Sequence, residues 1–316
     1  MMPAEKTIRA NGIDLTYFEW TGAPGNTQPP LMFAHATGFH ARVWDAVIEH
    51  FPERRVLSLD LRGHGRSGGG PVQSWRVFSE DVGALVEQLG IMGAIGIGHS
   101  MGAHTLVQCA ADRPAAFARL VLFDPVILEP EFYAAPAKGR SDEPHPASRR
   151  KRDFESAEAM IERFRDRLPY SLFAPRVFED YCRFGILPSP DGAGYELACS
   201  PEMEASVYGS ANRNSGILAA ATRVKAPTLV VRARQTGVRD FNGSPTWPEL
   251  AATMPAGTDL YRPDMTHFHP LQDPADAARI IREFADAEQG DQSPSACAPA
   301  ACAAAAEPPA LPPSQK

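Results

Sequence analysis

The sequence lacks the features that would indicate a membrane, a secretion signal or a nucleic acid. No window of it approaches the roughly 20 apolar residues that a membrane-spanning helix needs. Its first residues show no cationic stretch followed by an apolar one. Lys and Arg number 31 against 38 Asp and Glu, a formal charge of −7, so there is no basic excess to attract phosphates. We therefore expect a soluble, cytoplasmic protein that binds neither nucleic acid nor a membrane.

Cysteine is scarce, and its spacing is uninformative. The five cysteines are Cys109, Cys182, Cys199, Cys297 and Cys302. Their number is odd, and they form none of the closely spaced pairs that are typical of zinc sites. We interpret them as free thiols, mostly structural. The sequence also contains no metal-binding or nucleotide-binding motif, so we expect chemistry without a cofactor.

What the sequence does contain is an alternation of short apolar runs with amphipathic stretches of helical period. Its 316 residues, 44% of them hydrophobic, suffice for a sizeable core. Such alternation predicts an α/β fold, with a mostly parallel sheet covered by helices on both faces. The expected strands are 14–20, 30–35, 55–60, 94–99, 119–123, 228–232 and 258–262. Helices are expected to begin near Arg42, Gln73, Met101, Pro245 and Pro274.

The alternation stops between Asp124 and about Val224, where the sequence becomes charged, proline-bearing and helical in pattern. We interpret residues 127–224 as an inserted, mainly helical cap on a core made of residues 1–126 and 225–288. The basic run at 149–152 is expected on a solvated helix face. Residues 289–316 are rich in Ala and Pro, and we predict a disordered tail there.

One motif carries a specific chemical prediction. Gly98-His99-Ser100-Met101-Gly102 matches G-x-S-x-G, and it stands directly after an apolar strand and before a helical pattern. A serine on such a sharp strand-to-helix turn needs small neighbours, which the two glycines provide. The following helix points its free N–H groups towards the serine. Ser100 is the predicted nucleophile.

With this motif the chain resembles the α/β-hydrolase fold family, in its serine hydrolase and esterase branch with a helical cap. LMFAHATGFHARVW resembles the family's loop after the third strand, and LSLDLRGHGRS resembles its D-x-R-G-x-G-x-S segment. The resemblance covers about residues 8–288. It implies an oxyanion hole formed by the backbone N–H groups of Thr37 and Met101. It also implies that His35 bonds the backbone of its own loop.

The resemblance also indicates the general base. Asp264-Met265-Thr266-His267-Phe268-His269-Pro270 looks like the family's H-F-x-x-x-x-x-P segment, whose first histidine is catalytic. His267 fits this register, with Phe268 next to it and Pro274 further on. His269 is the competing candidate. An imidazole can take the serine proton and return it to a leaving group near neutral pH.

The acid of the triad is not where the family most often has it. Alignment of the strand at 228–232 places Thr236 at that position, and threonine carries no negative charge. Two carboxylates could replace it. Asp124 ends the strand after the nucleophile, where some family members carry their acid, and it is our prediction. Asp240, in the loop beyond Thr236, is the alternative.

A serine nucleophile favours acyl transfer through a covalent acyl-enzyme that water resolves. Hydrolysis of a carboxylic ester or lactone is the first hypothesis. The alternatives are hydrolysis of a carbon–carbon bond by the same triad, or a non-catalytic, ligand-binding member of the fold. Cap aromatics could line a pocket for an apolar or aromatic small molecule, or could hold the cap on the core: Phe132, Tyr133, Phe173, Phe178, Tyr181, Phe184 and Tyr208. The sequence does not indicate an oligomeric state.

Overall fold

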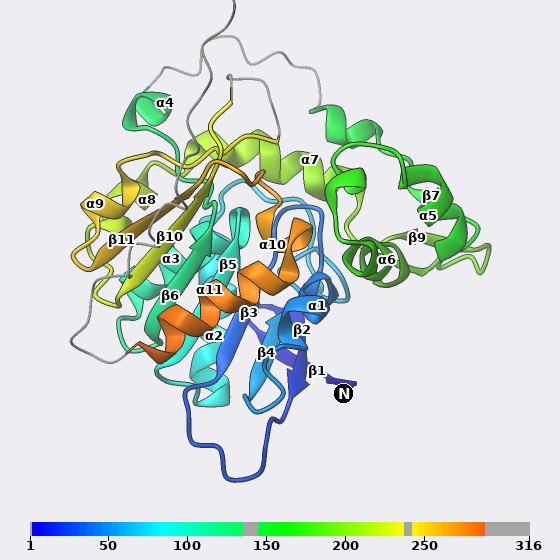
Figure 1. Cartoon of the computed structure of the whole chain (residues 1–316). Helices are drawn as coiled ribbons and strands as arrows, with labels where there is room; N and C mark the ends of the chain where they lie inside the picture. Colours follow the sequence, from blue (N-terminus) through cyan, green and yellow to red (C-terminus); the bar gives the residue numbers. More distant parts are fainter. Residues whose placement is uncertain (1, 135–144, 237–241, 288–316) are drawn as a thin grey trace, which may run out of the picture. The chain divides into compact units, whose positions relative to one another are not determined.

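The computed structural model describes residues 2–134, 145–236 and 242–287. The chain divides into two compact units, residues 1–285 and 286–316, and the fold described here is that of the first. A sheet of eight strands runs through this unit in the order β1-β2-β4-β3-β5-β6-β10-β11 (Figure 1). Its strands are β1 (Ala4–Ala10), β2 (Ile13–Trp20), β3 (Leu31–Ala34), β4 (Val56–Leu59), β5 (Ala94–His99), β6 (Phe117–Phe123), β10 (Thr228–Ala233) and β11 (Gly257–Arg262).

Most of the sheet is parallel, as predicted. Strands β1 and β2 are antiparallel to each other, β2 is antiparallel to β4, and all other pairs from β4 to β11 are parallel. Parallel strands need crossover connections, and helices supply them. The expected α/β fold class is therefore confirmed.

The core has two layers, one on each face of the sheet. Leu120 and Leu122 of β6 belong to one cluster of buried apolar side chains, whereas Val121 and Phe123 belong to the other. This division follows from the alternation of side chains along a strand. The first cluster includes α2 (Arg76–Leu89), α3 (Met101–Asp112), α8 (Gly216–Ala221) and α9 (Leu250–Thr253). The second includes α1 (Asp45–Ile48), α10 (His269–Gln272) and α11 (Pro274–Asp286).

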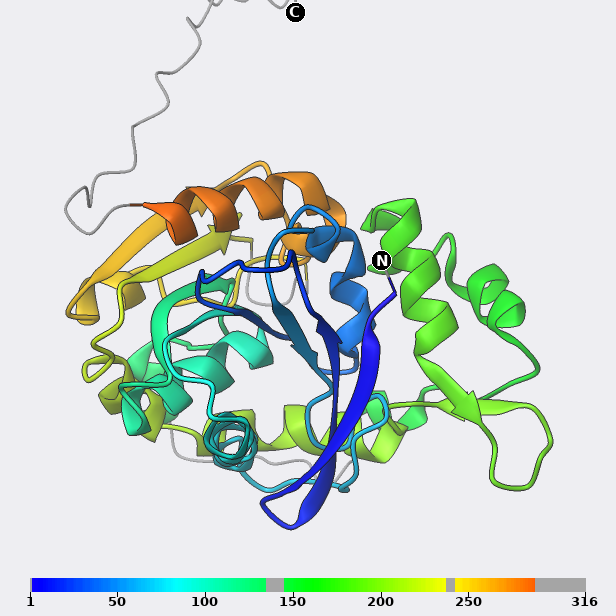
Figure 2. The same ribbon diagram turned by 90° about the horizontal axis from the view of Figure 1, so that it is seen from below.

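The segment between β6 and β10, which includes the predicted cap (residues 127–224), leaves the main sheet. It contains α4 (Pro130–Ala134), α5 (Ala157–Phe164), α6 (Pro175–Phe184) and α7 (Pro201–Ser210). It also contains a small antiparallel sheet in the order β7-β9-β8, made of β7 (Asp153–Phe154), β8 (Ile186–Pro188) and β9 (Tyr195–Leu197). Both views show α5, α6 and this small sheet beside the main sheet (Figures 1 and 2). The prediction of a mainly helical cap did not include these short strands.

Helix α7 is bonded directly to the core. The Val72 backbone N–H donates to Ser206 Oγ at 2.9 Å, and Trp75 Nε1 donates to the Val207 carbonyl at 2.9 Å. A Cβ added at Gly63 would lie 2.6 Å from Met203 Sδ, so the loop after β4 and α7 are in close contact. These contacts fix α7 on the segment between β4 and α2.

The predicted element boundaries differ from the structure at a few places. Strand β1 was not expected, because its side chains are mostly exposed at the edge of the sheet and give no apolar pattern. The helix expected near Gln73 begins at Arg76, and the one expected near Pro245 begins only at Leu250. The predicted tail lies outside the described residues, and the domain boundaries stay predictions. No helix within the described ranges is long and apolar enough to cross a membrane.

Candidate active site

Ser100 occupies a strained turn between β5 and α3. Its backbone has φ 57° and ψ −117°, a conformation that side-chain-bearing residues rarely adopt. A Cβ added at Gly98 would lie 2.5 Å from Ala103 Cα, and one added at Gly102 would lie 2.3 Å from the Ala34 carbonyl oxygen. Both glycines are therefore required where β5, α3 and the end of β3 meet. The G-x-S-x-G pattern has this steric cause.

The structure brings Ser100, His267 and Asp124 together. Ser100 Oγ lies 3.1 Å from His267 Nε2, and His267 Nδ1 lies 2.6 Å from Asp124 Oδ2. The carboxylate can only accept, so Nδ1–H donates to it, and Nε2 is then free to accept the serine hydroxyl proton. All three residues are buried. Their order along one relay is that of a nucleophile, a base and an orienting acid.

Asp124 directly follows β6, and several groups hold its carboxylate in place. Its backbone N–H donates to the Val231 carbonyl of β10 at 2.8 Å, and its φ is 49°. Oδ1 accepts a hydrogen bond from Ser244 Oγ and another from the Ala233 N–H at 3.2 Å. Thr246 Oγ1 lies 3.2 Å from the same oxygen and 2.8 Å from the Pro125 carbonyl. One carboxylate oxygen thus faces the histidine, and the other faces a set of donors.

The two alternative positions for the acid are not in this relay. Thr236 is exposed, and its hydroxyl packs against Gly243, where an added Cβ would lie 1.7 Å away. Asp240, the alternative carboxylate, lies outside the described residues. Ser244 and Thr246 were not anticipated, although both follow the expected acid position in the sequence.

The two neighbouring histidines have different partners. His267 donates its backbone N–H to the Asn242 carbonyl at 2.8 Å, and its own carbonyl accepts from His99 Nε2 at 2.7 Å. His269 instead bonds Asp276 Oδ2 through Nε2 at 2.8 Å and is buried. It is therefore His267 whose side chain faces Ser100.

The loop after β3 provides a turn beside the serine. The Phe39 N–H donates to the Ala36 carbonyl at 3.2 Å, and Gly38 has a φ of 78°, which favours glycine. Among the backbone bonds of the described residues outside helices and strands, none uses the N–H of Thr37 or Met101 as donor. The oxyanion hole formed by these two N–H groups stays a prediction.

His35 holds this loop, as expected from the sequence. Its Nδ1–H donates to the Ala36 carbonyl at 2.8 Å, and its Nε2 accepts from the Leu61 N–H at 3.0 Å. Both nitrogens are thereby committed in the neutral ring. Burial, with neighbouring His64 adding to it, holds the pKa of His35 well below its usual range. The ring is therefore a structural link between the loops after β3 and β4.

Arg150 corrects one sequence expectation. Arg149, Lys151 and Arg152 are exposed, as predicted for the basic run at 149–152, but the Arg150 side chain is only 18% exposed. It pairs with Glu204 of α7 and donates to the hydroxyls of Tyr170 and Tyr181 at 3.1 and 2.9 Å. A Cβ on Gly38 would lie 3.0 Å from Glu204 Oε1, so this pair packs directly on the turn beside Thr37.

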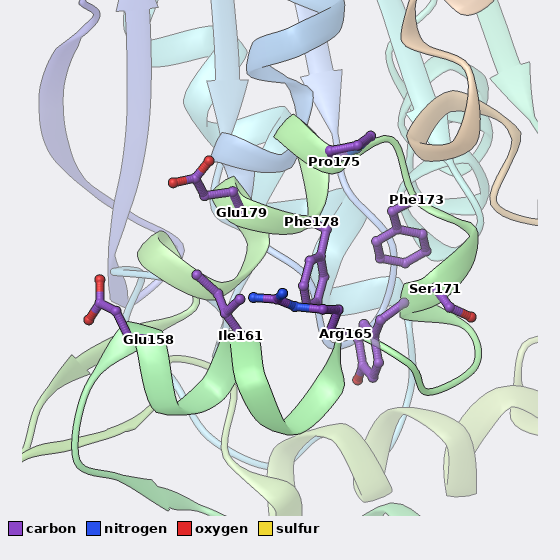
Figure 3. A pocket seen from close by; sticks show the side chains of 9 residues that line it. Glu158, Ile161, Arg165, Ser171, Phe173, Pro175, Phe178 and Glu179 are labelled. Atoms are coloured by element: carbon purple, nitrogen blue, oxygen red, sulfur yellow. The ribbon is translucent and has the colours of Figure 1, made fainter.

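A pocket of about 600 Å³ lies in the cap between α5 and α6 (Figure 3). Its lining residues are Glu158, Ile161, Arg165, Tyr170, Ser171, Phe173, Pro175, Phe178 and Glu179. Two of the predicted cap aromatics, Phe173 and Phe178, are among them. Phe173 also packs against Phe268, with ring centroids 5.4 Å apart. One wall of the pocket therefore adjoins the residue after His267. No member of the Ser100 relay lines this pocket.

The other predicted cap aromatics have separate surroundings. The Arg42 guanidinium lies 4.0 Å from the ring centroid of Phe184, and Tyr208 stacks on His145 at 4.7 Å. Phe132 is 43% exposed, and the Tyr133 hydroxyl accepts from the Leu128 N–H at 3.3 Å. Phe173 and Phe178 thus line the pocket, Phe184 contacts a residue between β3 and β4, and Phe132 is largely exposed.

The three cysteines within the described residues form no disulfide. Cys109, Cys182 and Cys199 are free and buried, and burial raises the pKa of both Cys109 and Cys182 to about 12. Cys297 and Cys302 lie outside the described residues. Within the described part of the chain, no group of three or more His, Cys, Asp or Glu side chains is arranged to hold a metal ion.

This fold and this relay of serine, histidine and aspartate define a class of proteins, and comparison with known families agrees. A family model for the alpha/beta hydrolase fold matches residues 29–250. The chain belongs to the α/β-hydrolase fold family.

Individual relatives match over shorter stretches. The sn-1-specific diacylglycerol lipase ABHD11 of Mus musculus is 36% identical over 103 residues, which are 31% of this chain and 33% of that protein. The bifunctional esterase/perhydrolase DCH of Acinetobacter calcoaceticus is 34% identical over 111 residues, or 33% of this chain and 38% of that protein. The matched region therefore spans between a third and two fifths of these curated relatives.

Solved structures share the fold over most of the chain. An E-2-(acetamidomethylene)succinate hydrolase superposes with a TM-score of 0.70 and 20% identity, covering 90% of this chain and all of that one. The peroxisomal α/β-hydrolase Lpx1 of Saccharomyces cerevisiae superposes with a TM-score of 0.69 and 18% identity, covering 90% of this chain and 88% of that one. At such identities the likeness concerns the fold alone.

Proposed function

We propose that this protein is a serine hydrolase that cleaves a carboxylic ester or lactone through an acyl-enzyme on Ser100. The observation that carries the proposal is the continuous relay from Ser100 Oγ through both ring nitrogens of His267 to Asp124. Burial of the whole relay supports it further, because electrostatic interactions are stronger away from water. The family and the esterase and lipase names of the relatives agree with this chemistry.

In the first half-reaction Ser100 Oγ attacks the carbonyl carbon while His267 Nε2 takes its proton. The oxygen that becomes negative is bound by the backbone N–H groups of Thr37 and Met101. His267 then gives its proton to the departing alcohol oxygen as the ester C–O bond breaks. Asp124 keeps Nδ1 protonated throughout and stabilises the imidazolium that forms.

In the second half-reaction a water molecule takes the place of the alcohol. His267 accepts a proton from the water, and the resulting oxygen attacks the acyl carbon of the enzyme ester. The tetrahedral intermediate collapses, the bond to Ser100 Oγ breaks, and His267 returns the proton to the serine. The products are a carboxylic acid and the free enzyme, with no cofactor consumed.

We propose an apolar or aromatic small molecule as substrate, and action in the cytoplasm. The apolar side chains of the cap support the first point. Hydrolysis of a carbon–carbon bond could use the same relay, and it is the outcome favoured if esters are not cleaved. A non-catalytic, ligand-binding protein would have no need for a buried relay that leaves Nε2 facing the serine.

The test is a substrate screen combined with covalent labelling. Purified full-length protein is assayed on p-nitrophenyl esters of rising acyl length and on a lactone panel, and in parallel treated with a fluorophosphonate. We expect ester or lactone hydrolysis, and labelling of the wild type but not of Ser100→Ala. A folded wild-type protein that is neither labelled nor active on any ester or lactone would overturn the proposal.

A further inference from the structure

His99, the residue before the proposed nucleophile, joins β5 to the loop that carries the proposed base. Its Nε2 lies 2.7 Å from the His267 carbonyl oxygen. The ring centroids of His99 and His267 are 5.0 Å apart, and His99 also makes an edge contact with Phe268 at 6.3 Å. His99 therefore contacts the base loop through one hydrogen bond and two rings.

The protonation state of His99 follows from its partner. A carbonyl oxygen only accepts, so His99 must carry its proton on Nε2 and donate it. Burial, together with the nearby His267, holds the pKa of His99 well below its usual range, so the ring stays neutral. A neutral neighbour leaves the positive charge that forms on His267 during proton transfer without a like charge beside it.

The His267 backbone is held on both sides. Its N–H donates to the Asn242 carbonyl at 2.8 Å, and its C=O accepts from His99. The backbone of the nucleophile is held as well, because the Ser100 N–H donates to the Phe123 carbonyl of β6 at 3.0 Å. Since His99 and Ser100 are consecutive residues, the bond from His99 ties the backbone of the base to that of the nucleophile.

We propose that His99 is a positioning residue, whose Nε2–H bond to the His267 carbonyl sets the distance between the base and Ser100 Oγ. This inference rests on the proposed function, since it concerns the same relay. The bond acts on the backbone of the base and not on the substrate. Its loss is therefore expected to change kcat and to leave KM almost unaltered.

Two substitutions of His99 by side chains of similar size distinguish the effect of the hydrogen bond from that of the ring packing. His99→Met removes the donor, and His99→Gln keeps an N–H group near the position of Nε2. A displacement of about 1 Å in a catalytic group can cost on the order of a hundredfold in rate. We expect His99→Met to lower kcat about 10- to 100-fold with KM within about threefold, and His99→Gln to stay within about fivefold of wild-type kcat.

His104→Met is the matched control. His104 is also buried and also bonds a backbone carbonyl, that of Val126, through Nδ1 at 3.0 Å. Its ring packs on Trp75 and not on the base loop. Both methionine variants lose a buried imidazole–carbonyl bond, so both should lower the melting temperature. Only His99→Met should lower kcat beyond about threefold.

The experiment measures kcat, KM, melting temperature and fluorophosphonate labelling rate for the wild type and the three variants, on the ester the wild type cleaves best. A low kcat in His99→Met with rescue in His99→Gln supports the positioning role. Equal kcat in both His99 variants and the control would overturn it, and so would loss of folding in His99→Met alone. An inactive, unlabelled wild type would instead reject the proposed function, so the two failures are distinguishable.

Discussion

Strands β6 and β10 are parallel neighbours, paired from Thr228↔Leu120 to Val231↔Phe123, yet their ends differ. The end of β6 is followed at once by Asp124, whose carboxylate bonds His267. The segment after β10 has the exposed Thr236 at the position where the resemblance to the family implies an acid. The N–H of Ala233, the last residue of β10, and the hydroxyl of Ser244, in the segment after it, both donate to Asp124.

The carboxylate that bonds His267 thus follows β6 and not β10. Neighbouring strands lie about 4.8 Å apart, so an aspartate can reach the same imidazole nitrogen from either strand end. When β6 supplies the carboxylate, the segment after β10 can supply donors that hold it.

The largest effect is expected at Ser100 and His267, which the relay needs whether the acid follows β6 or β10. Ser100→Ala and His267→Ala should each lower kcat by about four to six orders of magnitude, because triad members act as one unit. The melting temperature should stay close to that of the wild type. Steady-state rates with circular dichroism check both points. A near-normal rate in His267→Ala together with loss of activity in His269→Ala would contradict the histidine assignment.

A smaller effect is expected from the donors of the segment after β10. Ser244→Ala removes one hydrogen bond to Asp124 Oδ1 and leaves the Ala233 N–H in place, so we expect kcat to fall about tenfold. Ser79→Ala is the control, because the Ser79 hydroxyl is buried and bonds only the Arg76 carbonyl at 2.7 Å. Equal rates in the two variants would mean that the serine is not needed to hold the acid.

Stability is expected to depend on pH through histidines near the ends of the parallel strands. Burial lowers the pKa of His40 to about 3 and that of His64 and His104 to about 4. The unfolded chain therefore binds more protons than the folded one below about pH 6.5, and stability is lost as the pH falls from there. Each such group costs about 2 kcal/mol by pH 5.

Two buried carboxyls act in the opposite direction. Burial raises the pKa of Asp60 and of Asp180 to about 6, so the stability that they contribute is present in acid and is lost as the pH rises from about 4 to 6. The histidines outnumber them, and we expect a net loss of several kcal/mol between pH 7 and 5. Urea titrations at a series of pH values measure this. A midpoint that is constant over that range would contradict the expectation.

The smallest effect is expected from deletion of residues 289–316. Helix α11 ends at Asp286 and buries Ile280 and Ile281 against the core. Deletion of residues 289–316 should therefore leave kcat and melting temperature unchanged. Assay and calorimetry of the shortened protein check this, and a clear loss of either property would mean that the deleted residues contribute to the fold.

Much of the fold and of the candidate site could be predicted from the sequence, because their signals are local. Apolar runs marked the strands that are buried on both faces, and G-x-S-x-G marked a turn that has no space for side chains beside Ser100. The exposed edge strand β1 and the short cap strands gave no such pattern. Their formation depends on pairing with distant segments.

The residues of the candidate site were easier to predict from the sequence than the hydrogen bonds between them. Asp124 could be proposed, because a carboxylate at a strand end after the nucleophile has a position fixed by the sheet. Ser244, Thr246 and the partners of Arg150 could not, since each contact joins elements far apart in the sequence. The link between His99 and the base joins residues separated by 168 positions, and no local pattern indicates it.

The assignment of Asp124, the residue after β6, as the acid can be tested with one pair of variants. Turnover and fluorophosphonate labelling are compared between Asp124→Asn and Asp240→Asn, after both have been shown to fold. We predict that Asp124→Asn lowers kcat at least about a thousandfold, since the orienting carboxylate is lost. Asp240→Asn should lower it less than about tenfold. The reverse ranking would show that the acid lies in the loop after β10, and it would contradict the assignment of Asp124.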